Sequence, residues 1–226
     1  MEPTRFTTVI VAAFNTELFI GRCLRSLLHQ SVNDDSFEII IIDDGSQDRT
    51  PYAISQFCDP YESLIKVITN DTNIGLPASL NKGILAAKGE YVVRVDSDDY
   101  VSSHFIEFLR FYLDSNESAD AVACDYLTVD DSENIISKHD SSFVPIGCGI
   151  MFHKNKLIDC GLYDPEFLCH EERELRFRFA KKYNIEHLRL PLYRYREHEN
   201  GITKNNELMQ QYKNKLISKH GPEAAF

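Results

Sequence analysis

Short apolar runs alternate with amphipathic stretches along the first half of the chain. Runs of five to seven residues rich in Val, Ile and Tyr predict buried strands, because each run is short and bounded by turn residues or Gly. The stretches between them place apolar residues at helical spacing, which predicts helices. Such alternation indicates βαβ units, and therefore an α/β fold with a mostly parallel central sheet and helices on both faces. The expected strands cover 8–14, 37–42, 64–69 and 91–95, and the expected helices cover 17–30, 50–58 and 77–88.

The second half of the pattern is less regular. The segment 141–152 holds Pro145, Gly147 and Gly149, where small residues would let the backbone and a ligand approach closely. No internal repeat or low-complexity linker divides the sequence, so we expect one domain over residues 1–226. Helices are expected over 103–113, 154–160, 171–182 and 205–219, and strands over 120–129, 134–137, 185–188 and 192–196.

An acidic cluster follows the fourth expected strand. Asp96, Asp98 and Asp99 lie within four residues, and an extended backbone would point Asp96 and Asp98 to the same side. Two carboxylates about 5 Å apart repel by roughly 3 kcal/mol at an effective dielectric constant near 20, so a fold keeps such a cluster when a cation offsets the repulsion. Mg²⁺ and Mn²⁺ prefer oxygen ligands of this kind. On this stretch alone, a metal site and a solvated acidic turn are both open.

Polar residues end the other three expected strands as well. The carboxyl ends of parallel strands meet at one edge of the sheet, where open α/β sheets bind their ligands. Each polar pair alone has the ordinary interpretation of a turn, but four of them at one edge predict a binding site. They are Asn15 after the first strand, Asp43 and Asp44 after the second, and Asn73 and Gly75 after the third, beside the cluster already described.

Composition narrows the class of protein. The net charge of −11 argues against non-specific nucleic-acid binding, which needs a basic surface. The six cysteines show no C-x-x-C pair, and we expect buried, reduced thiols in a cytoplasmic protein. The N-terminal segment does not resemble a signal peptide, and no apolar run reaches the length of a membrane span. Peripheral membrane contact, at the inner face of the membrane, and the oligomeric state stay open.

Several segments, in order, resemble the family 2 glycosyltransferases of the GT-A fold. The first half carries V-I-V-A-A-F-N at 9–15, I-I-I-I-D-D-G-S-Q-D-R-T at 39–50, N-I-G-L at 73–76 and V-D-S-D-D at 95–99. The second half carries G-L-Y-D-P-E-F at 161–167, E-E-R-E-L-R-F-R at 171–178 and Y-R-Y-R-E-H-E-N-G-I-T at 193–203.

That resemblance implies a Rossmann-like α/β/α sandwich and an inverting transfer of sugar from a nucleotide-sugar donor, with a divalent metal. It also implies a division of the domain into a nucleotide-sugar-binding half (1–100), an acceptor and catalytic half (101–203) and a C-terminal helix (204–226).

The resemblance assigns the metal site to the D-x-D segment. Asp98 matches the principal ligand of Mn²⁺ or Mg²⁺, and Asp96 matches a contact to the donor ribose or the metal, with Asp99 in support. Ser97 is included in the donor-binding loop, and His198 matches the late contact of the family to metal or diphosphate. By itself, His198 in a charged segment is more typical of a surface histidine.

The nucleoside side of the site follows from the same resemblance. Asp44, with Asp43 beside it, matches the acid that accepts a hydrogen bond from the nucleobase, and uracil offers an N–H there, which favours a uridine donor. The ordinary alternative for this acidic pair is a turn. Other residues implied to lie around the nucleoside are Ala13, Asn15, Glu17, Asn73 and Gly75.

An inverting reaction needs a base that takes the proton of the acceptor hydroxyl, an effect of roughly 10²–10⁴ in rate. The resemblance places this base at Glu172, where Glu stands for the Asp of the family, so Glu171 is the alternative. A purely structural interpretation is that both acids stabilise a helix N-terminus. A second departure from the family is Leu80, where many members carry Arg, and this makes the identity of the sugar harder to infer.

These inferences predict transfer from a UDP-sugar to a hydroxyl of a glycan or lipid-linked glycan, in the synthesis of a bacterial surface polysaccharide. A sugar nucleotidyltransferase would carry a Gly-rich, basic loop after the first strand, which A-A-F-N-T-E lacks. A phosphatase of the D-x-D-x-T/V type is disfavoured because Tyr100 occupies the last position. A nucleotide-sugar-binding module without transferase activity is the remaining alternative, and only the Glu at 172 favours it.

Overall fold

A parallel sheet forms the first half of the protein, in a computed structural model that describes residues 6–197 and 205–225. The strands pair in the order β3-β2-β1-β4, with every neighbouring pair parallel. Their carboxyl ends therefore meet at one edge, as the sequence predicted. The strands are β1 (Thr7–Ala13), β2 (Phe37–Asp43), β3 (Ile65–Thr69) and β4 (Tyr91–Arg94).

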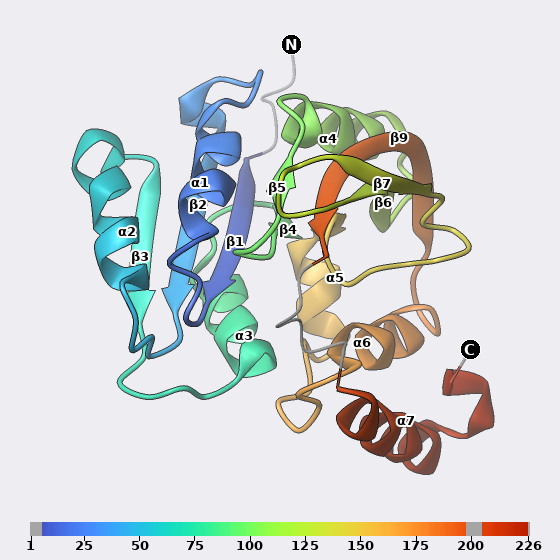
Figure 1. The fold of residues 1–226 in the computed structure, drawn as a ribbon. Coiled ribbons are helices and arrows are strands. Elements are labelled where there is room, and N and C mark those ends of the chain that lie inside the picture. The colour runs from blue at the N-terminus through green and yellow to red at the C-terminus, as the bar shows by residue number, and fades with distance from the viewer. Residues whose placement is uncertain (1–5, 198–204, 226) are drawn as a thin grey trace.

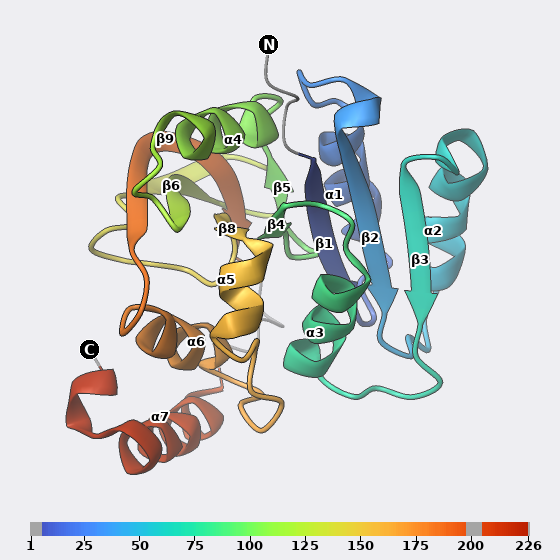
Figure 2. The ribbon, with the colours of Figure 1, turned by 180° about the vertical axis from the view of Figure 1, so that it is seen from behind.

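Helices cover both faces of this sheet, which makes the predicted α/β/α sandwich (Figures 1 and 2). Alternate residues of β1 point to opposite faces, so Val9 and Val11 join one core cluster while Ile10 joins the other. Leu24 packs in the first cluster and Leu80 in the second. The helices of this half are α1 (Ile20–Leu28), α2 (Thr50–Cys58) and α3 (Leu76–Ala86), with short 3₁₀ turns at Asp34–Ser36 and Asp59–Tyr61.

The sheet continues into the second half with mixed strand directions, in the order β4-β8-β6-β9-β5, and β7 pairs with β6. Two of the described strands were not predicted: β5, which is only two residues long, and β8, which overlaps the end of the Gly-containing segment. The prediction of separate strands at 185–188 and 192–196 was wrong, because one long strand runs through, with a shift of register where Asp125 faces Pro191. The strands are β5 (Tyr100–Val101), β6 (Ala121–Val129), β7 (Ile135–His139), β8 (Ile150–His153) and β9 (Ile185–Arg196).

Four α-helices complete the described part of the second half. Phe105 of α4 joins the same core cluster as α1, whereas Leu157 of α5 and Leu175 of α6 join the cluster of α3. The last helix, α7, packs below α6 through Leu216 and a buried Phe167 (Figure 1). These helices are α4 (Phe105–Ser115), α5 (Lys154–Asp159), α6 (Glu171–Phe179) and α7 (Asn206–His220), followed by a 3₁₀ turn at Pro222–Ala225.

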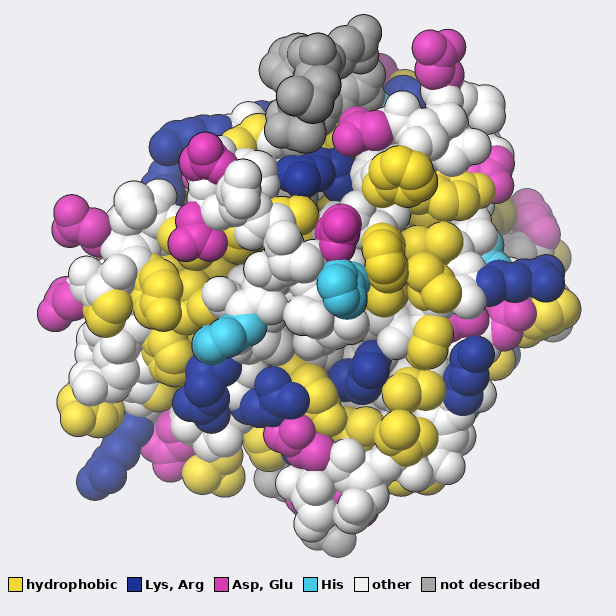
Figure 3. All heavy atoms as spheres, turned by 90° about the horizontal axis from the view of Figure 1, so that it is seen from above, with side chains coloured by type: hydrophobic (Ala, Val, Ile, Leu, Met, Phe, Trp, Pro, Cys, Tyr) yellow, Lys and Arg dark blue, Asp and Glu magenta, His cyan; other side chains and the backbone are white. Residues whose placement is uncertain are grey.

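The cysteines, the surface charges and the apolar character of the helices can be compared with what the composition predicted. All six cysteines are free; five are buried and Cys58 is half-buried, as the sequence predicted for reduced thiols. Lys and Arg, Asp and Glu, and hydrophobic side chains are interspersed over the face of the molecule seen in Figure 3. Within 6–197 and 205–225, no helix combines the length and apolar character that crossing a bilayer requires.

Candidate active site

A cleft of about 420 Å³ opens at the carboxyl end of β4. One wall comes from the turn that follows this strand, and another comes from the segment 145–148 and the N-terminal end of α6. Residues of both halves of the chain therefore face one space. The acidic residues that line it are Asp96, Asp98, Glu171, Glu172 and Glu197.

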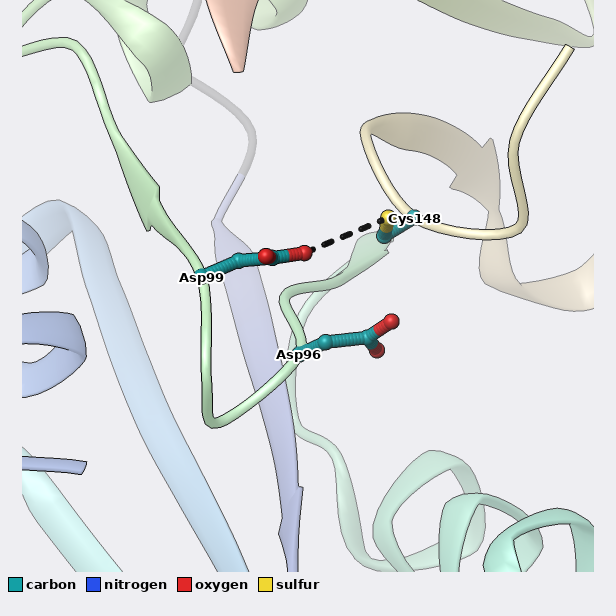
Figure 4. A group of neighbouring side chains, drawn as sticks. All are labelled: Asp96, Asp99 and Cys148. Atoms are coloured by element: carbon teal, nitrogen blue, oxygen red, sulfur yellow. Dashed lines mark hydrogen bonds between the residues drawn. The ribbon is translucent and has the colours of Figure 1, made fainter. Parts of the chain in front are cut away.

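Residues 96–99 form a turn, in which the N–H of Asp99 donates to the carbonyl of Asp96 at 3.1 Å. The extended backbone considered in the sequence analysis is therefore wrong for this segment. The turn brings the carboxylate of Asp96 near that of Asp99. With the thiol of Cys148 they form a group whose candidate ligand atoms all lie within 4.8 Å of one another (Figure 4).

Asp99 lies beneath the cleft and is held by the protein itself. Its side chain accepts hydrogen bonds from the hydroxyl of Tyr193 and the N–H of Arg196, each at 2.7 Å. Tyr193 in turn accepts from the N–H of Asp96 at 3.0 Å. Burial, and then the charges of Asp98 and Asp96, raise the pKa of Asp99 well above its ordinary value. Asp99 therefore serves as a buried support of the turn.

Cys148 points toward Asp99, at a distance of 3.9 Å between Sγ and Oδ2 (Figure 4). Burial is the largest cause that raises the pKa of this thiol well above its ordinary value, and the nearby Asp96 and Asp99 add to it. The side chain therefore stays a protonated thiol at neutral pH and is a poor ligand for a hard cation.

Arg94, which the sequence analysis did not single out, is one of the arginines that line the cleft, and it contacts acids from two segments. Its Nε and Nη2 donate to the two oxygens of Asp96, at 2.5 and 3.1 Å, and its Nη1 donates to Glu171 at 2.9 Å. Burial raises the pKa of Glu171 to about 7, an effect that the charge of Arg94 opposes. A positive charge that offsets the acidic repulsion is thus built into the protein.

Glu172 lines the cleft beside this buried pair, and 20% of its side chain is exposed. The backbone of Gly147 passes so close that a Cβ there would lie 2.8 Å from Cβ of Glu172 and 3.1 Å from Nη1 of Arg94. The expected close approach at the Gly-containing segment is therefore an approach to the helix that carries the candidate base. Asp98 and Ser97 also line the cleft, whereas His198 lies outside the described residues.

Asp44, the acid predicted to contact the nucleobase, accepts hydrogen bonds from a neighbouring loop of the protein. Asp44 accepts hydrogen bonds from the N–H of Ile74, the N–H of Gly75 and the side-chain amide of Asn70, all between 2.8 and 2.9 Å. Asp43 accepts from the N–H of Ser46 at 3.0 Å. These contacts fix the 70–75 loop against the turn after β2, so both acids have a structural task.

The loop after β1 is tied down in a similar way. Asn15 accepts from the N–H of Gln47 at 2.8 Å, and Glu17 accepts from the N–H of Arg49 at 2.7 Å. Ala12 and Leu76 line the cleft. Seven described residues that were predicted to lie around the nucleoside do not line it: Ala13, Asn15, Glu17, Asp43, Asp44, Asn73 and Gly75. Contact of these seven residues with a nucleoside stays a prediction.

A second group of acids with a histidine lies away from the cleft. Asp125, Asp140 and His187 have ligand atoms within 4.8 Å of one another. The ring Nε2 of His187 is 2.7 Å from Asp125, which also accepts from the N–H of Ser141 at 3.1 Å. These hydrogen bonds account for the group, which ties the start of the 141–149 segment to β6 and β9.

Comparison with known proteins identifies the family. The model of "Glycosyl transferase family 2" matches residues 8–184, which is well over half of the chain. The chain belongs to this family. A "Putative glycosyltransferase EpsH" of Bacillus subtilis is 37% identical over 123 residues, covering 54% of this chain and 34% of the relative. A "Poly(ribitol-phosphate) beta-glucosyltransferase" of Bacillus spizizenii is 38% identical over 112 residues, covering 49% of this chain and 17% of the relative.

Solved glycosyltransferases share the fold of this family 2 member. TarS of Staphylococcus aureus, in a complex with UDP-GlcNAc, has a TM-score of 0.79 at 20% identity and covers 97% of this chain and 70% of its own. The mannosyltransferase PcManGT of Pyrobaculum calidifontis, in a complex with GDP-Man and Mn²⁺, has a TM-score of 0.76 at 18% identity. This match covers 96% of this chain and 65% of the PcManGT chain. The GT-A fold is therefore confirmed. The matches to the curated relatives span only about a third of their length or less.

The cleft of this family 2 glycosyltransferase offers carboxylate oxygens that suit a hard divalent cation. Asp96 and Asp98 line the cleft, and oxygen is the ligand that Mg²⁺ and Mn²⁺ prefer. The deeper pair of Asp99 and Cys148 fits less well, because Asp99 is only 2% exposed whereas the side chain of Asp96 is 23% exposed, and because the thiol is protonated. The chemistry of the donor set therefore fits a cation at the mouth of the turn rather than beneath it.

Proposed function

We propose that this chain transfers a sugar from a UDP-sugar to an acceptor hydroxyl with inversion at the anomeric carbon. One observation carries the proposal: the turn with Asp96 and Asp98, and the acids at the start of α6, line one cleft. The first would hold the donor and the second would activate the acceptor. In this arrangement residues 1–100 bind the donor, residues 101–203 bind the acceptor and catalyse the transfer, and residues 204–226 are the C-terminal helix.

Glu172 is the general base of the proposed reaction. Its carboxylate takes the proton of the acceptor hydroxyl while that oxygen bonds to the anomeric carbon. The bond between the anomeric carbon and the diphosphate oxygen breaks in the same displacement, and its electron pair leaves with UDP. A single displacement from the opposite side inverts the configuration. Glu172 suits this task because it lines the cleft and is only partly exposed.

Asp98, with Asp96, would hold a Mn²⁺ or Mg²⁺ ion. When bound, such an ion neutralises charge on the departing diphosphate. The support for this assignment is the oxygen donor set at the mouth of the turn and the Mn²⁺ of the PcManGT complex. The late histidine, His198, is proposed as a further contact on the basis of its motif.

A uridine donor and a glycan acceptor are the finer part of the proposal. The support is the UDP-GlcNAc complex of TarS and the names of relatives that act on poly(ribitol-phosphate). We propose a glycan or lipid-linked glycan acceptor in bacterial surface polysaccharide synthesis, on the cytoplasmic side, with peripheral membrane contact to reach a lipid-linked acceptor. The proposed donor site consists of Ala13, Asn15, Glu17, Asp43, Asp44, Asn73, Gly75, Asp96 and Ser97, the first seven through the loops in which they lie.

The test is the Glu172→Gln variant. We expect it to bind UDP in calorimetry with the wild-type affinity and to lose transfer from UDP-sugars by about 10²–10⁴-fold, because Gln accepts no proton. Glu166→Gln is the matched control, since Glu166 lies on the surface and pairs with Lys215. Weakened UDP binding with normal turnover would move the base to another residue. Binding of UDP-sugar without transfer by the wild type would favour the binding module instead.

A further inference from the structure

A single buried guanidinium joins the two walls of the cleft. Arg94 stands at the end of β4, and only 10% of its side chain is exposed. It forms a forked pair with Asp96, two residues further along the chain, and a third hydrogen bond to Glu171, 77 residues away. The planar, forked donor set of Arg can bind two carboxylates at once, which the single ammonium of Lys cannot reproduce.

The same contact ties the first turn of α6 to the end of β4. The residue before the helix, His170, has a left-handed backbone with φ of 59° and makes no side-chain capping bond to the helix in the described structure. Glu171 and Glu172 are the first two residues of α6. The ion pair of Arg94 with Glu171 therefore fixes a helix end that ordinary capping does not fix.

We propose that Arg94 is a positioning residue that selects Glu172 as the base: it holds Glu171 in a buried ion pair and sets the start of α6 against the turn of Asp96. This inference rests on the proposed function. Glu171 also lines the cleft, but its carboxylate accepts a hydrogen bond from Arg94, so in this proposal it is the partner of Arg94 and not the base. Glu172, one residue further, is thereby held at the acceptor side. The backbone of Gly147 lies close to both Arg94 and Glu172, where a larger residue would meet them.

The first experiment compares two Arg→Lys substitutions at buried ion pairs. Arg94→Lys keeps the charge but loses the fork, and we expect kcat to fall about 10²-fold, since a displacement near 1 Å has this effect on a reacting group. The matched control is Arg178→Lys. Arg178 lies on the same helix, pairs with the fully buried Glu174 and the carbonyls of Cys160 and Leu162, and does not line the cleft. Arg178→Lys should lower the melting temperature as much as Arg94→Lys does, but its kcat should stay within about threefold of that of the wild type.

A second comparison separates positioning from stability. Glu171→Gln still accepts a hydrogen bond from Arg94, so we expect kcat to fall about tenfold and KM for the donor to stay unchanged. The double variant Arg94→Met with Glu171→Met replaces the ion pair by apolar side chains, which often restores stability. A merely structural role predicts that it regains activity, whereas positioning predicts that kcat stays about 10²-fold low in a folded protein.

Hydrogen exchange provides a readout that does not depend on activity. The amides of the first turn of α6 should exchange faster in Arg94→Lys than in Arg178→Lys. Unchanged exchange together with a kcat equal to that of the control overturns the inference, and so does a Glu171→Gln variant as inactive as Glu172→Gln. A wild-type protein without transfer overturns the proposed function and the base assignment together. An active wild type with an active Arg94→Lys variant overturns only the role of Arg94.

Discussion

Two acidic groups follow β2 and β4, the strands on either side of β1, and their side chains have different partners. After β2, Asp43 and Asp44 accept hydrogen bonds from nearby backbone and side-chain amides, and neither lines the cleft. After β4, Asp96 pairs with Arg94, and Asp98 lines the cleft. The first group shapes a loop, whereas the second faces the space where a ligand would bind.

The difference teaches that the chemistry of a carboxylate depends on which donors reach it. Neutral amide donors on Asp44 leave a local structure that is complete without a ligand. On Asp96 the donor is a shared cation, which also holds an acid from the other half of the chain. A shared cation couples the two walls of the cleft, so substitutions there should act on turnover, while substitutions at Asp44 should act on stability.

The largest effect is expected at the cleft. Asp98→Ala, or removal of divalent metal by a chelator, should lower sugar transfer by about 10³-fold, because the charge of the departing diphosphate is no longer neutralised. Thermal unfolding should be unchanged, since Asp98 is only partly buried. Full activity of the variant and of the chelated protein would refute the metal assignment.

The second prediction concerns the pH dependence of stability at Glu171. The folded protein holds the pKa of Glu171 at about 7, above the ordinary value of 4.5, with burial as the largest cause. As the pH rises, the unfolded chain loses this proton first, so the wild type loses stability between these two values, on the order of 3 kcal/mol. Glu171→Gln should lack this loss. Urea unfolding at several pH values would measure the free energy of unfolding of both proteins. The same dependence on pH in the wild type and in Glu171→Gln would contradict the raised pKa.

The third prediction uses glycine. Gly147→Ala places a Cβ 2.8 Å from Glu172, and we expect a destabilisation of about 1–3 kcal/mol with a loss of activity. Gly21→Ala is the control, because the nearest atom there is the flexible end of Arg25 at 3.5 Å. That helical substitution should stabilise by up to about 1 kcal/mol. Equal effects at the two glycines would show that the segment can move away from α6.

The smallest effect is expected at the loop. Asp44→Asn turns one acceptor oxygen into a donor that faces N–H groups, so unfolding should become easier by about 1–2 kcal/mol. Activity of the folded variant should stay near that of the wild type. A loss of UDP binding larger than the loss of stability would instead support direct contact between Asp44 and the nucleobase.

Much of the fold could be predicted from the sequence because its signals are local. The four apolar runs became β1 to β4, and 50–58 is a helix with the predicted ends. The two-residue β5 carries too little pattern to be detected, and β8 was hidden in a segment considered only for its small residues. Long β9 appeared as two strands because Pro191 interrupts its apolar pattern.

The site was predictable only in outline. Asp96, Ser97, Asp98, Glu171 and Glu172 were singled out by their motifs, and the structure brings these residues to one cleft. Arg94 was missed because an Arg at the end of a strand gives no signal of its partners, and the partner that matters is 77 residues away. The roles of Asp44 and Asp99 were equally hidden, since their donors come from distant segments.

The sequence by itself determined the alternation of strands and helices, the polar ends of the parallel strands and the order of motifs that marks the family. Only the tertiary structure decided which acids are occupied by the protein and which face the cleft. The physical reason is that periodicity is local, whereas the donors that satisfy Asp44, Asp99 and Glu171 reach them through contacts between segments far apart in the chain.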